Sequence, residues 1–147
     1  MIVAGKQKAG QAVQAPAPSE SVEQQCLFRW AAFYSGKYPE LELLHHIPNG
    51  GKRSKAEAAR FKAEGVKAGV PDVCLPIPRG GFHGVYIEMK RQGGRVSKEQ
   101  AKWLYILSKQ GYLTAVCYKW ENAAEILKDY LDGKHQRERG AENAVEE

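Results

Sequence analysis

The sequence predicts an α/β domain in which a mixed β-sheet is flanked by helices. Short runs rich in β-branched and aromatic residues alternate with longer segments that have apolar residues at helical spacing. Ser-x-x-Glu or Ser-x-x-Gln sequences, typical of capping boxes, open three of the helical segments. Two strand-like runs are joined by a short Gly-rich connection and the last is reached through a helix, so antiparallel and parallel neighbours are both expected.

A helix, a strand and a second helix are expected in the first half of the domain. The helix over residues 21–35 begins with the capping sequence SVEQ and ends before a glycine. The run LELLHHI, residues 41–47, is interpreted as a strand closed by the turn signal Asn-Gly-Gly at 49–51. A helix over residues 54–64 then begins with SKAE and ends before another glycine.

Three strands and two helices are expected in the second half. Strands over residues 72–77 and 84–91 flank the Gly-rich connection. A helix over residues 97–110 begins with SKEQ, and the run YLTAVCY at 112–118 predicts the next strand. A helix over residues 120–131 ends the domain.

Length and composition predict one domain with loose ends. The 147 residues are 43% hydrophobic and 27% charged, which suits a domain with a substantial core. Residues 1–18 have few large apolar side chains and are expected to be disordered, and residues 134–147 are expected to form a charged, flexible tail. The folded domain is therefore expected over residues 19–133. No run approaches the roughly 20 apolar residues that span a bilayer, and no secretory signal is present, so we expect a cytoplasmic protein without a membrane partner.

Two carboxylates and an ammonium are expected to meet on one face of the sheet. Side chains alternate along a strand, so Glu88 and Lys90 share a face and lie about 7 Å apart along it. Asp72 begins the preceding strand, which the short connection places alongside. Charges beside a core are costly unless they are paired or hold a metal.

Two interpretations of this cluster are open. Two carboxylates with a carbonyl or waters suit Mg²⁺ or Mn²⁺, and such an ion activates water and neutralises phosphate charge. Lys90 would then orient or deprotonate the attacking water, or stabilise the pentavalent phosphorane. The alternative is a plain salt bridge between Glu88 and Lys90 on an exposed sheet face.

The positive charge is concentrated around this cluster. Residues 37–110 contain 14 Lys and Arg against 7 Asp and Glu, within a chain whose net charge is +5. Such a field suits a polyanion, with nucleic acid first, and a solvated basic surface without a partner is the open alternative. The residues expected to contact DNA are Lys52, Arg53, Lys55, Lys67 and Arg91.

The spacing of these groups resembles a known motif. Pro-Asp at 71–72, followed after fifteen residues by Glu-Met-Lys at 88–90, resembles the PD-(D/E)XK nuclease motif. The segments HIPNGGKRS, GVKAGVPDVCLPIP, GVYIEMKRQGGRVSKEQ and GYLTAVCY, in this order, resemble the VRR-NUC family of virus-type replication-repair nucleases. The likeness covers roughly residues 20–131 and implies a restriction-endonuclease-like αβββαβ core.

The resemblance implies a role for each residue of the motif. Asp72 and Glu88 would be metal ligands, with the Met89 backbone carbonyl as a third, and Lys90 would be the catalytic lysine. The implied cofactor is Mg²⁺ or Mn²⁺, and no small-molecule cofactor is expected.

Further residues have both a functional and a structural interpretation. Gln100 matches a family glutamine near the active site, although Ser97 and Gln100 also spell a capping box. Glu23 matches an acid that completes the metal site, or is an exposed helix residue. His45 and His46 are adjacent in the expected strand and therefore face opposite ways, so they are not expected to bind one metal.

The function implied by the resemblance is that of a metal-dependent, structure-selective DNA endonuclease in a bacterium or a phage-infected host. Small standalone members of the family are dimeric enzymes that cleave four-way junctions, so branched DNA and a homodimer are expected. The competing classes are a non-catalytic DNA-binding module of the same fold and a flap or nicking nuclease.

Overall fold

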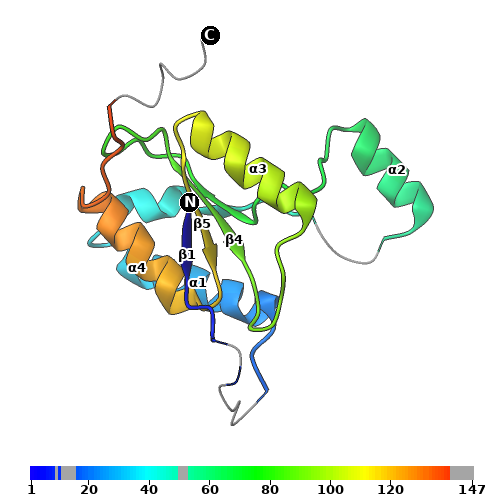
Figure 1. Ribbon diagram of the computed structural model, residues 1–147, viewed down its shortest axis with the longest axis horizontal. Coiled ribbons are helices and arrows are strands. Elements are labelled where there is room, and N and C mark those ends of the chain that lie inside the picture. Colours follow the sequence, from blue (N-terminus) through cyan, green and yellow to red (C-terminus); the bar gives the residue numbers. More distant parts are fainter. Residues whose placement is uncertain (9, 11–15, 50–52, 140–147) are drawn as a thin grey trace.

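Five strands form one mixed sheet in the computed structural model, which describes residues 1–8, 10, 16–49 and 53–139 (Figure 1). The strands are β1 Ile2–Ala4, β2 His45–His46, β3 Val73–Leu75, β4 Val85–Met89 and β5 Leu113–Cys117. They lie in the order β1-β5-β4-β3-β2. Strands β1 and β4 are parallel to β5, whereas β3 is antiparallel to both β4 and β2. The predicted α/β fold with a mixed sheet is confirmed.

Helices lie on both faces of this sheet. The helices are α1 Glu20–Tyr34, α2 Lys55–Ala63, α3 Lys98–Lys109 and α4 Trp120–Leu131, with a short 3-10 helix at Pro39–Leu43. Helices α1 and α4 pack together on one face, and α3 covers the other (Figure 1). Helix α2 stands away from the sheet and buries none of its residues (Figure 1).

The alternation expected along β4 decides which groups face which helices. Val85, Ile87 and Met89 are buried in the main core with residues of α1 and α4. The side chains between them point to the opposite face, where Leu104 of α3 packs on Val116 of β5. The charged pair of the motif therefore lies under α3.

Helix α1 begins two residues earlier than the sequence pattern predicts. Ser19 is extended, and its Oγ accepts a hydrogen bond from the Val22 backbone N–H (3.2 Å). Ser21, the predicted cap, lies inside the first turn, where its hydroxyl oxygen accepts a hydrogen bond from Gln25. The earlier start puts Glu20 in the first turn, where the helix dipole favours a carboxylate. The other two predicted capping boxes both form.

The run LELLHHI is not one strand, as predicted, but a 3-10 turn followed by the two residues of β2. Pro39 opens the turn with a φ suited to it. Leu41 and Leu44 are both buried while Leu43 is 53% exposed, so burial follows a spacing of three and not an alternation. The predicted turn at 49–51 lies mostly outside the described residues.

Part of the segment predicted to be disordered, residues 1–18, completes the sheet. Val3 of β1 pairs with Val116 of β5, so Ile2–Ala4 is an edge strand. The Gln92 side chain then accepts a hydrogen bond from the Gln7 N–H (3.0 Å) and donates one to the Gly5 carbonyl. The low average hydrophobicity of residues 1–18 concealed this short apolar run, Ile-Val-Ala. Residues 9 and 11–15 of the segment lie outside the described residues.

The start of the predicted flexible tail is also attached to the domain. The Arg137 N–H donates to the Gly80 carbonyl (2.8 Å), and residues 140–147 lie outside the described residues. Within the described part of the chain, no helix is long and apolar enough to cross a membrane.

Candidate active site

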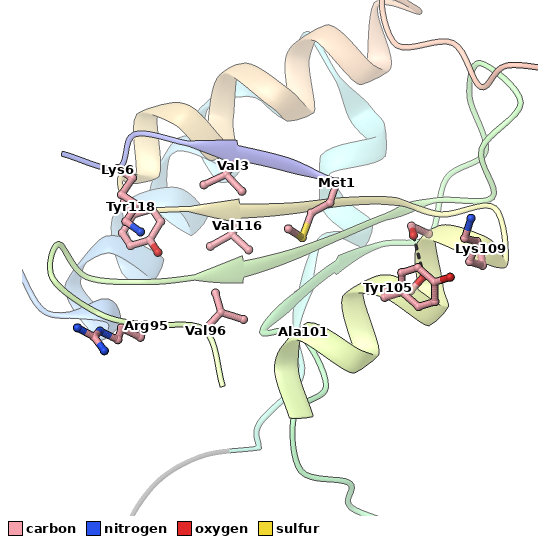
Figure 2. Close-up of a pocket in the computed structure, with 11 residues that line it drawn as sticks. Met1, Val3, Lys6, Arg95, Val96, Ala101, Tyr105, Lys109, Val116 and Tyr118 are labelled. Carbon is pink, nitrogen blue, oxygen red and sulfur yellow. Dashed lines mark hydrogen bonds between the residues drawn. The ribbon is translucent and has the colours of Figure 1, made fainter. Parts of the chain in front are cut away.

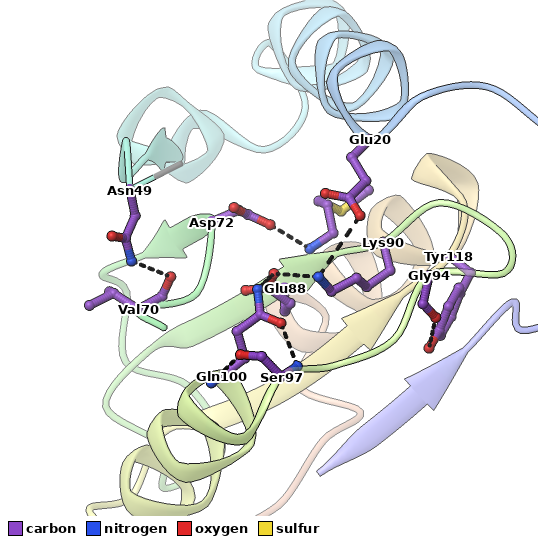
Figure 3. A network of polar contacts seen from close by, with 11 residues as sticks. Glu20, Asn49, Val70, Asp72, Glu88, Lys90, Gly94, Ser97, Gln100 and Tyr118 are labelled. Carbon is purple, nitrogen blue, oxygen red and sulfur yellow. Dashed lines mark hydrogen bonds and ion pairs between the residues drawn. The ribbon is translucent and has the colours of Figure 1, made fainter. Parts of the chain in front are cut away.

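The register of β3 and β4 brings the two carboxylates of the motif face to face. Val73 pairs with Ile87, which places Asp72 directly opposite Glu88 on the face covered by α3. Asp72 Oδ2 accepts a hydrogen bond from the Met89 backbone N–H (2.9 Å; Figure 3). The Asp72 carboxylate is thereby fixed at the end of β4.

Glu88 is a buried carboxylate with one satisfied and one unsatisfied oxygen. The side chain is 2% exposed, and Oε1 accepts a hydrogen bond from Gln100 Nε2 (2.7 Å; Figure 3). Among the described residues, nothing donates a hydrogen bond to Oε2. Burial and the charge of Asp72 raise the pKa of Glu88 to about 8, although Lys90 opposes this shift.

Lys90 supplies the positive charge of the site. Its Nζ lies 3.6 Å from Glu88 Oε1 and 3.8 Å from Glu20 Oε1 (Figure 3). The lysine is itself buried, at 8% exposure. The plain surface salt bridge between Glu88 and Lys90 is therefore wrong, because neither side chain is on the surface.

Lys90 compensates the charge of the two carboxylates only in part. Burial also raises the pKa of Asp72, and the Met89 N–H lowers it only in part. A proton shared between Asp72 and Glu88, or a cation between them, would relieve both the repulsion and the missing donor at Oε2. The donor set thus fits a hard divalent cation.

Such a cation would need ligands besides acidic side chains, for example a backbone carbonyl oxygen. Within the described residues, no group of three or more His, Cys, Asp or Glu side chains is arranged to hold a metal. The N–H and C=O of one strand residue point to the same side, so the Met89 carbonyl faces the side of Asp72. The register places Pro71 opposite Met89, and Pro71 has no N–H to donate to that carbonyl.

Gln100 has both of the roles that the sequence left open. Its Oε1 accepts a hydrogen bond from the Ser97 N–H (2.9 Å), which completes the capping box of α3. Its Nε2 at the same time donates to Glu88. The start of α3 and the orientation of the Glu88 carboxylate are therefore fixed by one amide.

Glu23, a predicted metal ligand, contacts the start of a helix in the structure, and its role at a metal stays a prediction. Glu23 is buried, and its Oε2 accepts a hydrogen bond from the Trp120 N–H (2.7 Å) at the start of α4. Lys119, the N-cap of α4, makes no side-chain cap, so Glu23 substitutes for one. Glu20, one turn earlier on α1, is the carboxylate beside Lys90. Both acids lie on the same side of α1, and only tertiary packing decides which one reaches the site.

The two histidines brace the backbone beside the site. His46 Nδ1 lies 2.8 Å from the carbonyl oxygen of Asp72, and His45 Nδ1 lies 3.0 Å from that of Leu43. A carbonyl only accepts, so each Nδ1 is the donor. Both side chains are exposed.

The residues expected to contact DNA lie on separate parts of the chain. Arg53 stacks on Phe61 of α2, with its guanidinium carbon 4.2 Å from the ring centre, and Lys55 begins that projecting helix. Lys67 lies beside Trp103 of α3, and the exposed Arg91 directly follows Lys90. Lys52 lies outside the described residues. Their contacts with DNA stay predictions.

A mixed sheet with a carboxylate before one strand and Glu-x-Lys at the end of its antiparallel neighbour defines the PD-(D/E)XK class of nuclease folds. The family model of the VRR-NUC domain matches residues 13–120, and the chain belongs to this family. A solved structure of a VRR-NUC domain protein is 30% identical and superposes with a TM-score of 0.68, covering 80% of this chain and 91% of that chain. No curated protein gives a significant match.

Proposed function

We propose that this protein is a metal-dependent DNA endonuclease that hydrolyses phosphodiester bonds in branched DNA such as four-way junctions. One observation carries the chemistry: Asp72 and Glu88 face each other beside Lys90, and the buried Glu88 Oε2 has no donor among the described residues. Membership of a nuclease family supports the reaction class.

Asp72, Glu88 and the Met89 carbonyl are the proposed ligands of Mg²⁺ or Mn²⁺. When bound, such an ion lowers the pKa of coordinated water and neutralises charge on the phosphate. Asp72 is kept in place by the Met89 N–H and Glu88 by Gln100. Glu20 is the α1 carboxylate that faces this site, in place of Glu23.

Lys90 is the proposed catalytic lysine. Its ammonium is buried beside Glu88, and little water surrounds it. Its attraction for a bound phosphate is therefore weakly screened. There it orients the attacking water or stabilises the charge that develops on the phosphate oxygens. Exposed cations such as Lys55, Lys67 and Arg91, together with Arg53 and Lys52, would position the phosphate backbone.

A homodimer is proposed because a four-way junction is cut on two strands at related points, and two sites related by a two-fold axis accomplish this. Family resemblance carries this part of the proposal. Aromatic residues support it only weakly, because Tyr130 is fully buried in the core and Trp120 packs against that core.

The function is tested with labelled four-way junctions, flaps and blunt duplexes, each incubated with Mg²⁺, Mn²⁺ or EDTA. We expect paired, symmetric nicks in the junction with either metal and none in EDTA. Undiminished cleavage in EDTA would contradict the metal mechanism. Tight junction binding without cleavage under any condition would identify a non-catalytic module, and cleavage of flaps alone would identify a flap nuclease.

A further inference from the structure

A groove of about 750 Å³ lies between the edge strand β1, strand β5 and helix α3 (Figure 2). Its floor is apolar and includes Val3, Val96 and Val116. Val3 is 53% exposed and Tyr105, at the side of the groove, is 64% exposed. The volume is in the range of ligand sites, roughly 300–1,000 Å³.

The rim of this groove is positively charged. Lys6, Arg95 and Lys109 line it, and none of the described lining residues is acidic. Figure 2 shows Lys6 and Arg95 toward one end and Tyr105 and Lys109 toward the other. Lys109 Nζ lies 5.5 Å from the centre of the Tyr105 ring. An apolar floor, an exposed aromatic ring and a cationic rim suit an occupant that has both flat apolar groups and negative charge.

The groove adjoins the candidate active site on the same face of the sheet. Val116, in the groove floor, is the cross-strand partner of Glu88. Arg95 lies in the segment that links Lys90 to α3, and the Tyr118 hydroxyl donates to the Gly94 carbonyl of this segment (3.4 Å). Arg95 thus places a positive charge in the segment between Lys90 and helix α3, at the groove.

We propose that this groove binds a single-stranded segment of the DNA substrate, with a base stacked on Tyr105 and phosphates held by Lys6, Arg95 and Lys109. The proposal deepens the nuclease function proposed above and rests on it. Stacking on an aromatic ring beside a basic track is the general means of binding unpaired bases.

Charge argues against a second copy of the chain as the occupant. A two-fold contact would bring the same surface of both copies together. The cations Lys6, Arg95 and Lys109 would then face the same set of cations on the other copy, with no acidic residue among the described lining residues to compensate. An acidic peptide would satisfy the charges, but it would not account for the position of the groove beside the active site.

The first test is the affinity for a fluorescein-labelled oligo-dT strand, measured by anisotropy in EDTA so that no turnover occurs. Tyr105→Ala should weaken binding about tenfold or more, whereas Tyr105→Phe should retain it, because stacking needs the ring and not the hydroxyl. Lys109→Ala should lower the dependence of log affinity on log salt by about 0.7. Phe33→Ala is the matched control, because Phe33 is an exposed aromatic residue on α1.

The second test is photocross-linking of a 5-iodouracil strand, which should attach to the α3 peptide that contains Tyr105. Unchanged oligo-dT affinity of Tyr105→Ala, or cross-links only outside the groove, would overturn the proposal. A fall in molecular mass with Tyr105→Ala would overturn it in favour of a second copy. Binding is read without cleavage, so a chain that binds oligo-dT through Tyr105 but cuts no DNA would refute the nuclease function alone.

Discussion

Glu88 and Lys90 are buried charges whose cost to the fold is not fully compensated within the described residues. Gln100 donates to one oxygen of Glu88, Lys90 lies 3.6 Å from the same oxygen, and Asp72 repels the carboxylate from the facing strand. Buried charges with perturbed pKa values in such clusters are characteristic of functional sites.

Replacing Lys90 separates chemistry from DNA binding. Lys90→Ala should lower the single-turnover cleavage rate by about 10²–10³, by analogy with the loss of one charge-stabilising donor. DNA affinity should fall far less, because one phosphate contact among several is removed. Lys98→Ala, at an exposed cation that begins α3, is the control. A normal rate for Lys90→Ala would show that the assigned catalytic lysine is wrong.

Removing the two carboxylates on one side of α1 should affect different properties, stability for Glu23 and cleavage for Glu20. Glu23→Ala removes the acceptor of the Trp120 N–H and should cost about 1 kcal/mol of unfolding free energy, the usual value of a helix cap, with little change in rate per folded molecule. Glu20→Ala should leave stability nearly unchanged and alter cleavage, because Glu20 faces Lys90. Urea denaturation and single-turnover kinetics on both variants measure this, and equal effects on both quantities would contradict the assignment.

The sequence predicts the inner part of the site better than its outer part. Asp72, Glu88 and Lys90 follow from strand alternation and one short connection, which are local rules. The choice between Glu20 and Glu23 depends on how α1 packs against β4 and α4, and no local rule contains that information. The sequence gives two competing interpretations of Gln100, and both hold. Its amide oxygen accepts the Ser97 N–H while its amide nitrogen donates to Glu88.

At the scale of elements, the two capping boxes form a matched pair. Ser97 begins α3, which covers the candidate active site, whereas Ser54 begins α2, which buries none of its residues. Ser97→Ala should lower the unfolding free energy by about 1 kcal/mol and reduce cleavage, because Gln100 loses a fixed helix start. Ser54→Ala should loosen α2 with little change in global stability, because α2 contributes no core residue.

Hydrogen exchange of the α2 amides and urea denaturation distinguish the two serine variants. Faster exchange confined to α2 is expected for Ser54→Ala, together with weaker DNA binding if Arg53 and Lys55 contact phosphates. A cooperative loss of global stability in Ser54→Ala would show that α2 packs on the body of the domain, contrary to its position in the structure.

Elements with a clear period or cap were predictable, whereas the two edges of the sheet were not. The helices begun by Ser54 and Ser97 follow from their caps. The LELLHHI run has apolar residues that fit a strand, yet Pro39 and burial at every third residue make its first part a helical turn. Strand β1 has only three residues, and its stability comes from pairing with a distant strand and not from its own sequence.

At the scale of the molecule, a divalent cation should stabilise the fold. A ligand at about 100 times its Kd contributes about 2.7 kcal/mol, which should raise the Tm of a domain of this size by roughly 5–15 °C. Asp72→Asn should abolish this increase and raise the Tm of the metal-free protein, because it removes one of two facing carboxylates. Asp129→Asn, on the surface beside Lys134, is the control and should keep the metal response.

A thermal melt with and without Mn²⁺ checks this without any DNA or cleavage. A metal-induced increase that survives in Asp72→Asn would place the binding site elsewhere. A lower Tm for metal-free Asp72→Asn would mean that the hydrogen bond from Met89 outweighs the repulsion between the carboxylates.

The oligomeric state is also predicted at the scale of the whole molecule. Light scattering should give a mass of twice the 16.4 kDa chain at micromolar concentration, if two sites act together on one junction. A monomeric mass, with activity only on flaps or single strands, would refute the dimeric junction-cleaving function and leave the nuclease proposal intact.

The edge position of β1 also orders events during synthesis. Val3 leaves the ribosome about 110 residues before its partner Val116, which at the usual elongation rates is a delay of roughly 6–20 s. Throughout that interval β1 is an unpaired apolar segment, whereas α1, β3 and β4 can already associate. The strand nearest the start of the chain is therefore one of the last to dock, and nascent chains stalled before β5 should remain open to proteases at Ile2–Ala4.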